Sequence, residues 1–371
     1  MYEQDQRIVM TLDAGGTNFV FSAIQGCKEI VDPIRLPAAP NDLTRCLSTL
    51  VEGFLEVEKR LAKLPAAISF AFPGPADYAH GIIGDLPNFP AFRGGVALGP
   101  YLEAQFGIPT FINNDGNLFA YGEAIGGLLP EVNEELRSAG RTRRYQNLIG
   151  ITLGTGFGAG VVIGNQLLTG DNGCGGDVWL MRNKRYPSLI AEESVSIRAV
   201  RRVYEERSGT DASALSPKDI FDIAEGTRAG DRPAAISSFG ELGEVAADAI
   251  VRALDIVDGL VVIGGGVAGA AKYILPNLLE ETRRTVGTFA GDTFPNLQME
   301  VFDLTNPTHR AEFLSEEEAW VNVPRSDKQV PYLRRKKTGI ALSTLGTSRA
   351  IAIGAYAFAL NELSKKQIQS K

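Results

Sequence analysis

The stretch Ile8-Val9-Met10-Thr11-Leu12, followed by Asp13-Ala14-Gly15-Gly16-Thr17-Asn18, decides how the rest of the sequence is interpreted. The apolar run predicts a buried strand, and Phe19–Ile24 predicts a second strand after a tight turn. Glycines in that turn let backbone N–H groups approach phosphate oxygens without a Cβ in the way, and Thr17 can donate a hydroxyl. Asp13, at the strand end, can hold Mg²⁺, usually through water. The alternative is a simple hairpin turn.

A second glycine turn, Leu153-Gly154-Thr155-Gly156-Phe157-Gly158, follows another apolar run at 148–153. Each half of the chain therefore begins with a strand, a glycine turn and a second strand, which indicates an internal duplication of topology. A hairpin is again the alternative. Two such turns can face each other across a cleft and clamp one triphosphate.

A third glycine segment, Val261-Val262-Ile263-Gly264-Gly265-Gly266-Val267-Ala268, leads from a buried strand toward a helix. Glycines here let the chain lie flat against a nucleotide base and ribose. Such joints are also common in α/β folds that bind nothing there. No Walker loop is present, because no Gly-Lys-Ser/Thr follows the glycines.

The segment Asn113-Asn114-Asp115-Gly116-Asn117 stands between a predicted strand and a predicted helix. A carboxylate at this point can take the proton of a substrate hydroxyl as its oxygen attacks the γ-phosphorus. An N-cap of the helix is the alternative, and both can hold. Three amides around one acid exceed what a cap needs, which favours catalysis.

Further carboxylates occur between Gly170 and Glu193, in Gly175-Gly176-Asp177 and in Glu192-Glu193. Carboxylates accept hydrogen bonds from adjacent sugar hydroxyls. For Glu192 the alternative is a favourable charge in the first turn of a helix.

Composition bounds the class of protein. The 371 residues favour two domains, and a net charge of −7 with a pI near 5.2 argues against a nucleic-acid-binding surface. The N-terminus lacks a signal-peptide pattern, and the longest nearly apolar stretch, 260–271, is too short to span a bilayer. Cys27, Cys46 and Cys174 form no CxxC pair, so we expect neither zinc nor a disulfide framework, and a reducing cytoplasm.

Periodicity places the remaining elements, and the polar stretch 130–146 is a predicted boundary. We expect further strands at 29–36, 66–72, 110–112, 159–163, 260–263 and 298–303. We expect helices at 41–62, 116–126, 190–206, 217–225, 231–257, 271–285 and 346–364.

In this order and spacing, the motifs resemble the ROK family (repressors, open reading frames and sugar kinases) over roughly 8–300 and the last helix. Ser69–Pro75 is similar to the family's strand and Pro-Gly-Pro turn, and Leu86–Phe89 to the segment before its sugar site. The resemblance implies an α/β, two-domain ribonuclease H-like fold of the actin-like ATPase and hexokinase superfamily. We expect a small domain of 1–117 plus 346–371 and a large domain of 118–345.

The resemblance further implies ATP-dependent phosphorylation of a hexose or hexose derivative in the cytoplasm, by a homodimer, with Mg²⁺. Asp115 would be the catalytic base. The implied sugar ligands are Asn88, Asn114, Asp177 and Glu192. The implied ATP ligands are Asp13, Gly15, Gly16, Thr17, Gly154, Thr155, Gly156, Gly265 and Gly266, with Asp13 also holding Mg²⁺ through water.

The sequence departs from the family pattern after Gly176. Asp177 stands where the family has glutamate, and Leu180 where it has a histidine that contacts sugar and ligates zinc. No cysteine follows Cys174, so we predict no structural zinc. The region 304–338 is longer than the family norm, and its charge runs predict a solvated loop, with a lid or an oligomer contact as the alternatives.

Other functions stay open at this point. A non-catalytic sugar sensor and a kinase for a non-sugar alcohol are both compatible with the motifs. A repressor is not expected, because Asp13 lies only twelve residues from the start and leaves no room for a helix-turn-helix domain.

Overall fold

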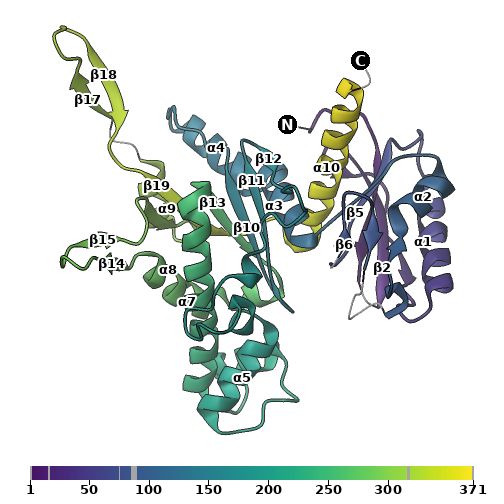
Figure 1. Cartoon of the computed structure of the whole chain (residues 1–371), viewed down its shortest axis with the longest axis horizontal. Coiled ribbons are helices and arrows are strands. Elements are labelled where there is room, and N and C mark those ends of the chain that lie inside the picture. The colour runs from purple at the N-terminus through teal and green to yellow at the C-terminus, as the bar shows by residue number, and fades with distance from the viewer. Residues whose placement is uncertain (1, 16, 75, 85–89, 316–317, 370–371) are drawn as a thin grey trace. The chain divides into compact units, whose positions relative to one another are not determined.

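The computed structural model describes residues 2–15, 17–74, 76–84, 90–315 and 318–369, shown in Figure 1. The chain divides into two compact units. The first comprises Met1–Pro130, Gly160–Gly176 and Thr344–Lys371, and the second comprises Glu131–Ala159 and Asp177–Ser343. The predicted polar boundary therefore begins where the chain first passes from one unit to the other. The predicted domain limits at 117 and 346 stay a prediction.

The first unit contains a sheet in the order β3-β2-β1-β5-β9, with β4 paired to β2. β1 runs antiparallel to β2 and parallel to β5, and β5 runs parallel to β9. The strands are β1 (Val9–Ala14), β2 (Asn18–Gln25), β3 (Lys28–Glu29), β4 (Ile34–Pro37), β5 (Ala67–Ala71) and β9 (Thr110–Asn113). A smaller sheet joins β6 (Ala76–Asp77), β7 (Ile82–Ile83) and β8 (Val96–Ala97).

Helices cover both faces of the first sheet. On one face, an apolar cluster joins the strands to α1 (Leu43–Glu58) and α2 (Leu98–Phe106), with Phe21, Phe54 and Phe70 fully buried. On the other face lie α3 (Asp115–Gly126) and α10 (Thr347–Gln369). The strands can serve both layers because successive side chains of a strand point to opposite faces of the sheet.

The second sheet has the order β12-β11-β10-β13-β19-β16. Three pairs of neighbours in this sheet are parallel: β10 with β13, β13 with β19, and β19 with β16. Its strands are β10 (Leu148–Leu153), β11 (Phe157–Ile163), β12 (Gln166–Leu167), β13 (Leu260–Gly264), β16 (Glu300–Asp303) and β19 (Lys337–Leu342). A glycine-turn hairpin beside a run of parallel strands thus occurs in both sheets, as the predicted duplication requires.

The other helices and short turns belong mostly to the second unit. The helices are α4 (Leu128–Ser138), α5 (Ile197–Ser208), α6 (Pro217–Glu225), α7 (Arg232–Val257), α8 (Ala271–Thr282) and α9 (Pro307–Leu314). The 3-10 turns are Pro90–Phe92, Val178–Leu180, Ala191–Glu193 and Gly266–Ala270. The predicted helix 190–206 begins later than expected, because Ser196 caps α5 by accepting a hydrogen bond from the Ala199 N–H.

The region 304–338 differs from the prediction of a solvated loop. It contains α9 and the hairpin of β17 (Glu318–Asn322) and β18 (Gln329–Leu333), and it ends in β19. Lys337, the last residue of the basic run, is only 5% exposed. Its ammonium group donates to the carbonyls of Glu312, Phe313 and Ser315 at the end of α9. The prediction from charge runs was wrong for Lys337 because helix carbonyls take the place of water.

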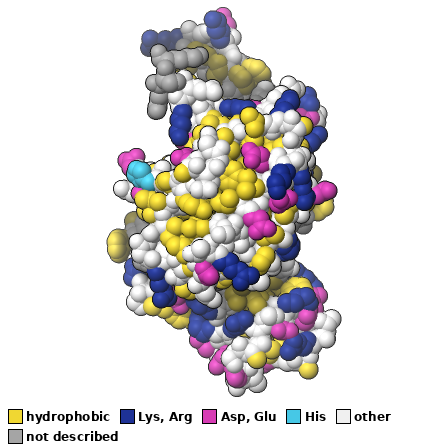
Figure 2. Space-filling model, turned by 90° about the vertical axis from the view of Figure 1, so that its right-hand side faces the viewer, with side chains coloured by type: hydrophobic (Ala, Val, Ile, Leu, Met, Phe, Trp, Pro, Cys, Tyr) yellow, Lys and Arg dark blue, Asp and Glu magenta, His cyan; other side chains and the backbone are white. Residues whose placement is uncertain are grey.

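A second exposed hairpin joins β14 (Thr285–Gly287) and β15 (Thr293–Pro295). Figure 2 shows one face of the molecule, on which apolar side chains gather near the middle and charged side chains lie around them. Within the part of the chain that the structure describes, no helix is both long and apolar enough to cross a membrane.

Candidate active site

The carboxyl ends of three parallel strands meet at one edge of the first sheet. Asp13 of β1 pairs in register with Ala71 of β5, and Ala71 pairs with Asn113 of β9. Strands lie about 5 Å apart, so Asp13 and Asn113 are separated by roughly 10 Å across the edge. Ligands in α/β folds bind at this edge, outside the carboxyl ends of the strands.

The turn from β9 into α3 is built from amide side chains. Asn114 is the N-cap of α3, and its Oδ1 accepts from the Gly116 N–H at 2.8 Å. Asn113 is buried, and its Oδ1 accepts from the Asn114 N–H at 2.7 Å and from Asn117 Nδ2 at 3.0 Å. These bonds fix the backbone direction at Asp115, the first residue of the helix.

The structure thus brings Asn113 and Asn117 to the site beside the predicted Asn114 and Asp115. Sequence reasoning counted their amides but gave them no role. The signal was the cluster of amides itself, because Asn113 ends the strand and Asn117 lies in the first turn of the helix that follows. The segment does cap the helix, and the catalytic role of Asp115 stays a prediction.

Asp115 presents an exposed carboxylate at the start of α3. Desolvation by the surrounding protein atoms raises its pKa, and the hydrogen bond from the Gly116 N–H opposes that rise. A carboxylate with a raised pKa is a stronger base than an ordinary aspartate, which is what proton removal from a hydroxyl requires.

The first glycine turn joins β1 to β2 in the same unit. Asp13 and Thr17 are exposed, and the Thr17 carbonyl accepts from the Ala38 N–H at 3.0 Å. A Cβ on Gly15 would stand 2.9 Å from the Asn18 carbonyl oxygen, so the turn leaves no space for a side chain there. The predicted ligands Gly16 and Asn88 lie outside the described residues.

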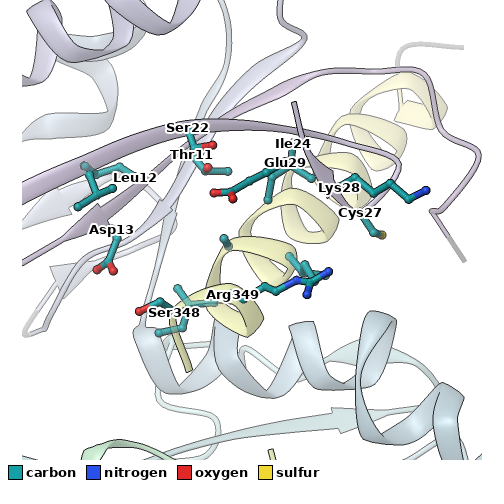
Figure 3. A pocket seen from close by; sticks show the side chains of 14 residues that line it. Thr11, Leu12, Asp13, Ser22, Ile24, Cys27, Lys28, Glu29, Ser348 and Arg349 are labelled. Carbon is teal, nitrogen blue, oxygen red and sulfur yellow. The ribbon is translucent and has the colours of Figure 1, made fainter. Parts of the chain in front are cut away.

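A cavity of about 520 Å³ lies beside this turn, between the β1–β2 hairpin and the first turns of α10. Figure 3 shows Asp13 on the strand, with Ser348 and Arg349 on the helix, lining the same space. Among the described residues, Arg349 has no hydrogen-bond or ion-pair partner. Figure 3 shows Ser348 on the side of the cavity near Asp13, whereas the side chain of Arg349 points away from Asp13. The cavity thus offers a hydroxyl near the predicted phosphate turn and a cation farther from it.

The two other predicted nucleotide segments also meet at one sheet edge, in the second unit. β10 and β13 are parallel neighbours with Thr152 opposite Gly264, so the turn after each strand begins at the same level. Gly265 has φ 91°, and a Cβ there would lie 2.3 Å from the Leu153 carbonyl oxygen. Gly266 faces open space, because a Cβ added to it would meet no atom within 4 Å.

Glu192 lies directly against the second glycine turn. Its Oε2 accepts from the Phe157 N–H at 3.0 Å, and its Oε1 pairs with Arg198 at 3.2 Å. A Cβ on Gly156 would lie 2.4 Å from Glu192 Oε2, so only glycine allows this approach. The structure therefore gives Glu192 a contact with the turn that the sequence reasoning did not anticipate.

In the segment 177–180, which departs from the family pattern, Val178 is buried and the other three residues are exposed. Desolvation raises the pKa of Asp177, and a hydrogen bond with the side chain of Trp179 opposes that rise. Trp179 and Leu180 are 36% and 53% exposed, so Asp177 stands beside an apolar surface. The three cysteines are free, and among the described residues no group of three or more His, Cys, Asp or Glu lies close enough to hold a metal ion.

Comparisons with known proteins show what the chain is similar to. The model of the ROK family matches residues 9–303. A crystal structure of glucokinase from Parabacteroides distasonis has 60% sequence identity and a TM-score of 0.86, covering 97% of this chain and 99% of that chain. Glucokinase of Thermotoga maritima is 28% identical, covering 73% of this chain and 85% of its own length. N-acetyl-D-glucosamine kinase of Vibrio vulnificus is 26% identical, covering 77% and 98%.

Proposed function

Because the chain belongs to the ROK family, we propose that it transfers the γ-phosphoryl group of ATP to a hydroxyl of a hexose, with Asp115 as the general base. The chain is a carbohydrate kinase, as its relatives are glucokinases and N-acetylglucosamine kinases with the same fold. The predicted two-domain α/β fold is that of this family. A non-catalytic sensor is not favoured.

One observation carries the proposal for the mechanism: an exposed carboxylate of raised pKa at the carboxyl ends of parallel strands, held by an amide network. In this mechanism Asp115 accepts the proton of the sugar hydroxyl as its oxygen attacks the γ-phosphorus. General-base help of this kind contributes roughly 10²- to 10⁴-fold to the rate.

The residues present fit ATP and Mg²⁺. Each glycine turn by itself has an exposed threonine whose hydroxyl suits a phosphate oxygen: Thr17 in the first unit and Thr155 in the second. The exposed carboxylate of Asp13 fits a hydrated Mg²⁺, which would neutralise charge on the phosphates. Gly266 leaves room for the adenosine, and Gly265 lets the chain pass close to Leu153.

For the sugar, we propose glucose as the first substrate and N-acetylglucosamine as the second, following the names of the relatives. Asn88, Asn114, Asp177 and Glu192 are the proposed sugar ligands. The apolar surface of Trp179 and Leu180 beside Asp177 would contact a sugar face or an acetyl group.

The test is sugar-dependent release of ADP from Mg-ATP across glucose, N-acetylglucosamine, mannose and fructose. Asp115→Ala should lower kcat by at least about 10²-fold with little change in sugar binding. The matched control is Glu134→Gln, which removes an exposed carboxylate paired only with surface groups. Turnover that survives in Asp115→Ala would remove Asp115 from the mechanism. Absence of turnover with every sugar in the unaltered protein would contradict the proposed substrate class.

A further inference from the structure

The loop between the proposed sugar ligands Asp177 and Glu192 is closed around one buried amide. Asn183 has 0% exposure, and its side chain uses its full hydrogen-bonding capacity. Oδ1 accepts from the Arg185 N–H at 3.0 Å and the Tyr186 N–H at 3.1 Å. Nδ2 donates to the Ile190 carbonyl at 3.2 Å and to Ser194 Oγ at 2.9 Å. One side chain thus joins the start of the loop to its end.

The same loop is anchored to α7 and α8 by ion pairs. Lys184 pairs with Glu281 and with Glu244, the latter at 3.5 Å. Arg185 pairs with Glu244 at 2.7 Å and with Glu241 at 3.1 Å. Glu241 and Glu281 are each 4% exposed, and buried charges of this kind are costly unless they are paired. The loop therefore has a fixed position on the two helices.

The end of the loop is hydrogen-bonded to the second glycine turn. Glu192, two residues before Ser194, accepts from the Phe157 N–H, and the Ile197 N–H donates to the Gly154 carbonyl at 3.0 Å. The turn is thus held on both sides by the segment 192–197. Asn183, through Ser194, fixes the middle of that segment.

We infer that Asn183 is a positioning residue for phosphoryl transfer: it holds Glu192 against the turn 154–156, so that the turn is preorganised for phosphate. This inference rests on the proposed function. The competing explanation is that Asn183 only stabilises the fold, as a buried amide with four hydrogen bonds would do anywhere. The two explanations differ in whether Asn183 acts through Glu192.

A double-mutant cycle separates them. Asn183→Ala should lower kcat/KM roughly tenfold in the unaltered background and less than about twofold in the background of Glu192→Ala, because residues that act in one network are not additive. Ser194→Ala removes one bond of the route and should reproduce the effect of Asn183→Ala. The control for lost stability is Ser216→Ala, which removes the capping box of α6. Equal losses in both backgrounds, or an equal loss in the control, would overturn the inference.

Hydrogen exchange gives a readout that does not depend on turnover. Asn183→Ala and Ser194→Ala should both speed exchange in the peptide that contains residues 154–158, where the Phe157 amide loses its held acceptor. Ser216→Ala should not. Unchanged exchange in both variants refutes the positioning role even if the protein is an active kinase. Faster exchange supports it even if no sugar in the panel is phosphorylated, in which case the proposed function alone fails.

Discussion

Asp115 lies where two demands on one side chain conflict. As an N1 residue it accepts from the Gly116 N–H, an arrangement that stabilises the charged form. Desolvation favours the neutral form and is the larger effect, so the pKa is raised. A base that must be charged to work is thus held where charge is disfavoured, which is typical of catalytic groups.

The pH dependence of turnover follows from this direction. A general base works deprotonated, so kcat/KM should fall as the pH falls through the pKa of Asp115, and that acid limb should lie above the ordinary aspartate value of 3.8. The measurement is kcat/KM against pH, with circular dichroism to show that the protein stays folded. An acid limb at or below the ordinary value would contradict the assignment.

The stability of the fold should change with pH in the opposite direction from turnover. Because the folded-state pKa is raised, the folded protein binds more protons than the unfolded chain between the two pKa values, and stability is lost as the pH rises through that window. Asp115→Asn removes the charge and should raise the unfolding temperature at pH 7, with a smaller gain near pH 4. Glu134→Gln is the control, since its carboxylate has a lowered pKa beside Arg137. A lower unfolding temperature for Asp115→Asn at pH 7 would refute the argument.

At the level of single residues, some residues of the candidate site could be predicted from the sequence, and some contacts between them could not. Asp115 and Asn114 could be found because strand, amides and helix follow one another directly. The contact of Glu192 with the Phe157 N–H could not, because 35 residues separate them and no local pattern links them. Asn183 was missed for the same reason: a buried amide has no signature in sequence until its partners are known.

Among the elements, α3 and α10 approach each other through glycine. A Cβ on Gly354 would lie 1.9 Å from the Leu118 carbonyl oxygen, and one on Gly122 would lie 1.8 Å from the Ala350 carbonyl oxygen. The two helix backbones are therefore in direct contact, and neither can give way to a methyl group without moving the other.

Gly354→Ala should lower the free energy of unfolding by about 1–3 kcal/mol, despite the better helix propensity of alanine. Gly126→Ala is a matched control in α3, because its Cβ would meet only Ile353 side-chain atoms at 3.5 Å, an ordinary contact. Urea unfolding of both variants measures the difference. If both variants had similar free energies of unfolding, the α3 and α10 backbones could move apart without loss of stability, and the argument would be wrong.

Predictions for elements succeeded where local signals were complete. The helix 217–225 was predicted with its limits from Ser216 as N-cap and Pro217 in the first turn, and the structure adds a capping box with Asp219. β19 was missed because Lys337 and Thr338 begin it with polar residues after a basic run, yet both are buried. Their partners are carbonyl groups, among them the Gly259 carbonyl that accepts from Thr338, and these lie far away in sequence.

At the scale of the whole molecule, the hairpin β17–β18 offers a surface for the homodimer that the family resemblance implies. In this register Trp320 and Pro331 share one face of the hairpin, and Val321 and Val330 share the other. Trp320 and Val321 are 58% and 50% exposed. An isolated two-stranded hairpin is marginally stable in water, so apolar side chains on both faces favour burial against a second copy.

We therefore expect the protein to be a dimer that Trp320→Glu weakens at least tenfold in dissociation constant, since aromatic anchors dominate such interfaces. Leu64→Glu alters a side chain that is 86% exposed in the first unit and should leave assembly unchanged. Sedimentation velocity over a range of concentrations measures the assembly of the unaltered protein and of both variants. A monomer at all concentrations, or a dimer unaffected by Trp320→Glu, would exclude the hairpin as the interface.

The architecture as a whole was predictable because it repeats. Two glycine turns after buried strands indicated two related halves, and the two sheets share the order of their first four strands, β3-β2-β1-β5 and β12-β11-β10-β13. The return of the chain to the first unit at 160–176 was not predicted, since those residues carry no pattern that says which sheet they join.

The chain returns to the first unit at 160–176 and again at 344, where α10 follows. The second return affects how the first unit folds during synthesis. Tyr356 of α10 is fully buried and accepts a hydrogen bond from the Gly26 N–H, and Leu360 packs with Val9 and Ala67. On the ribosome, this face of the first sheet emerges long before the helix that covers it. The nascent first unit therefore has an uncovered apolar face until α10 has been synthesised, and an apolar face of this kind is what chaperones bind during translation.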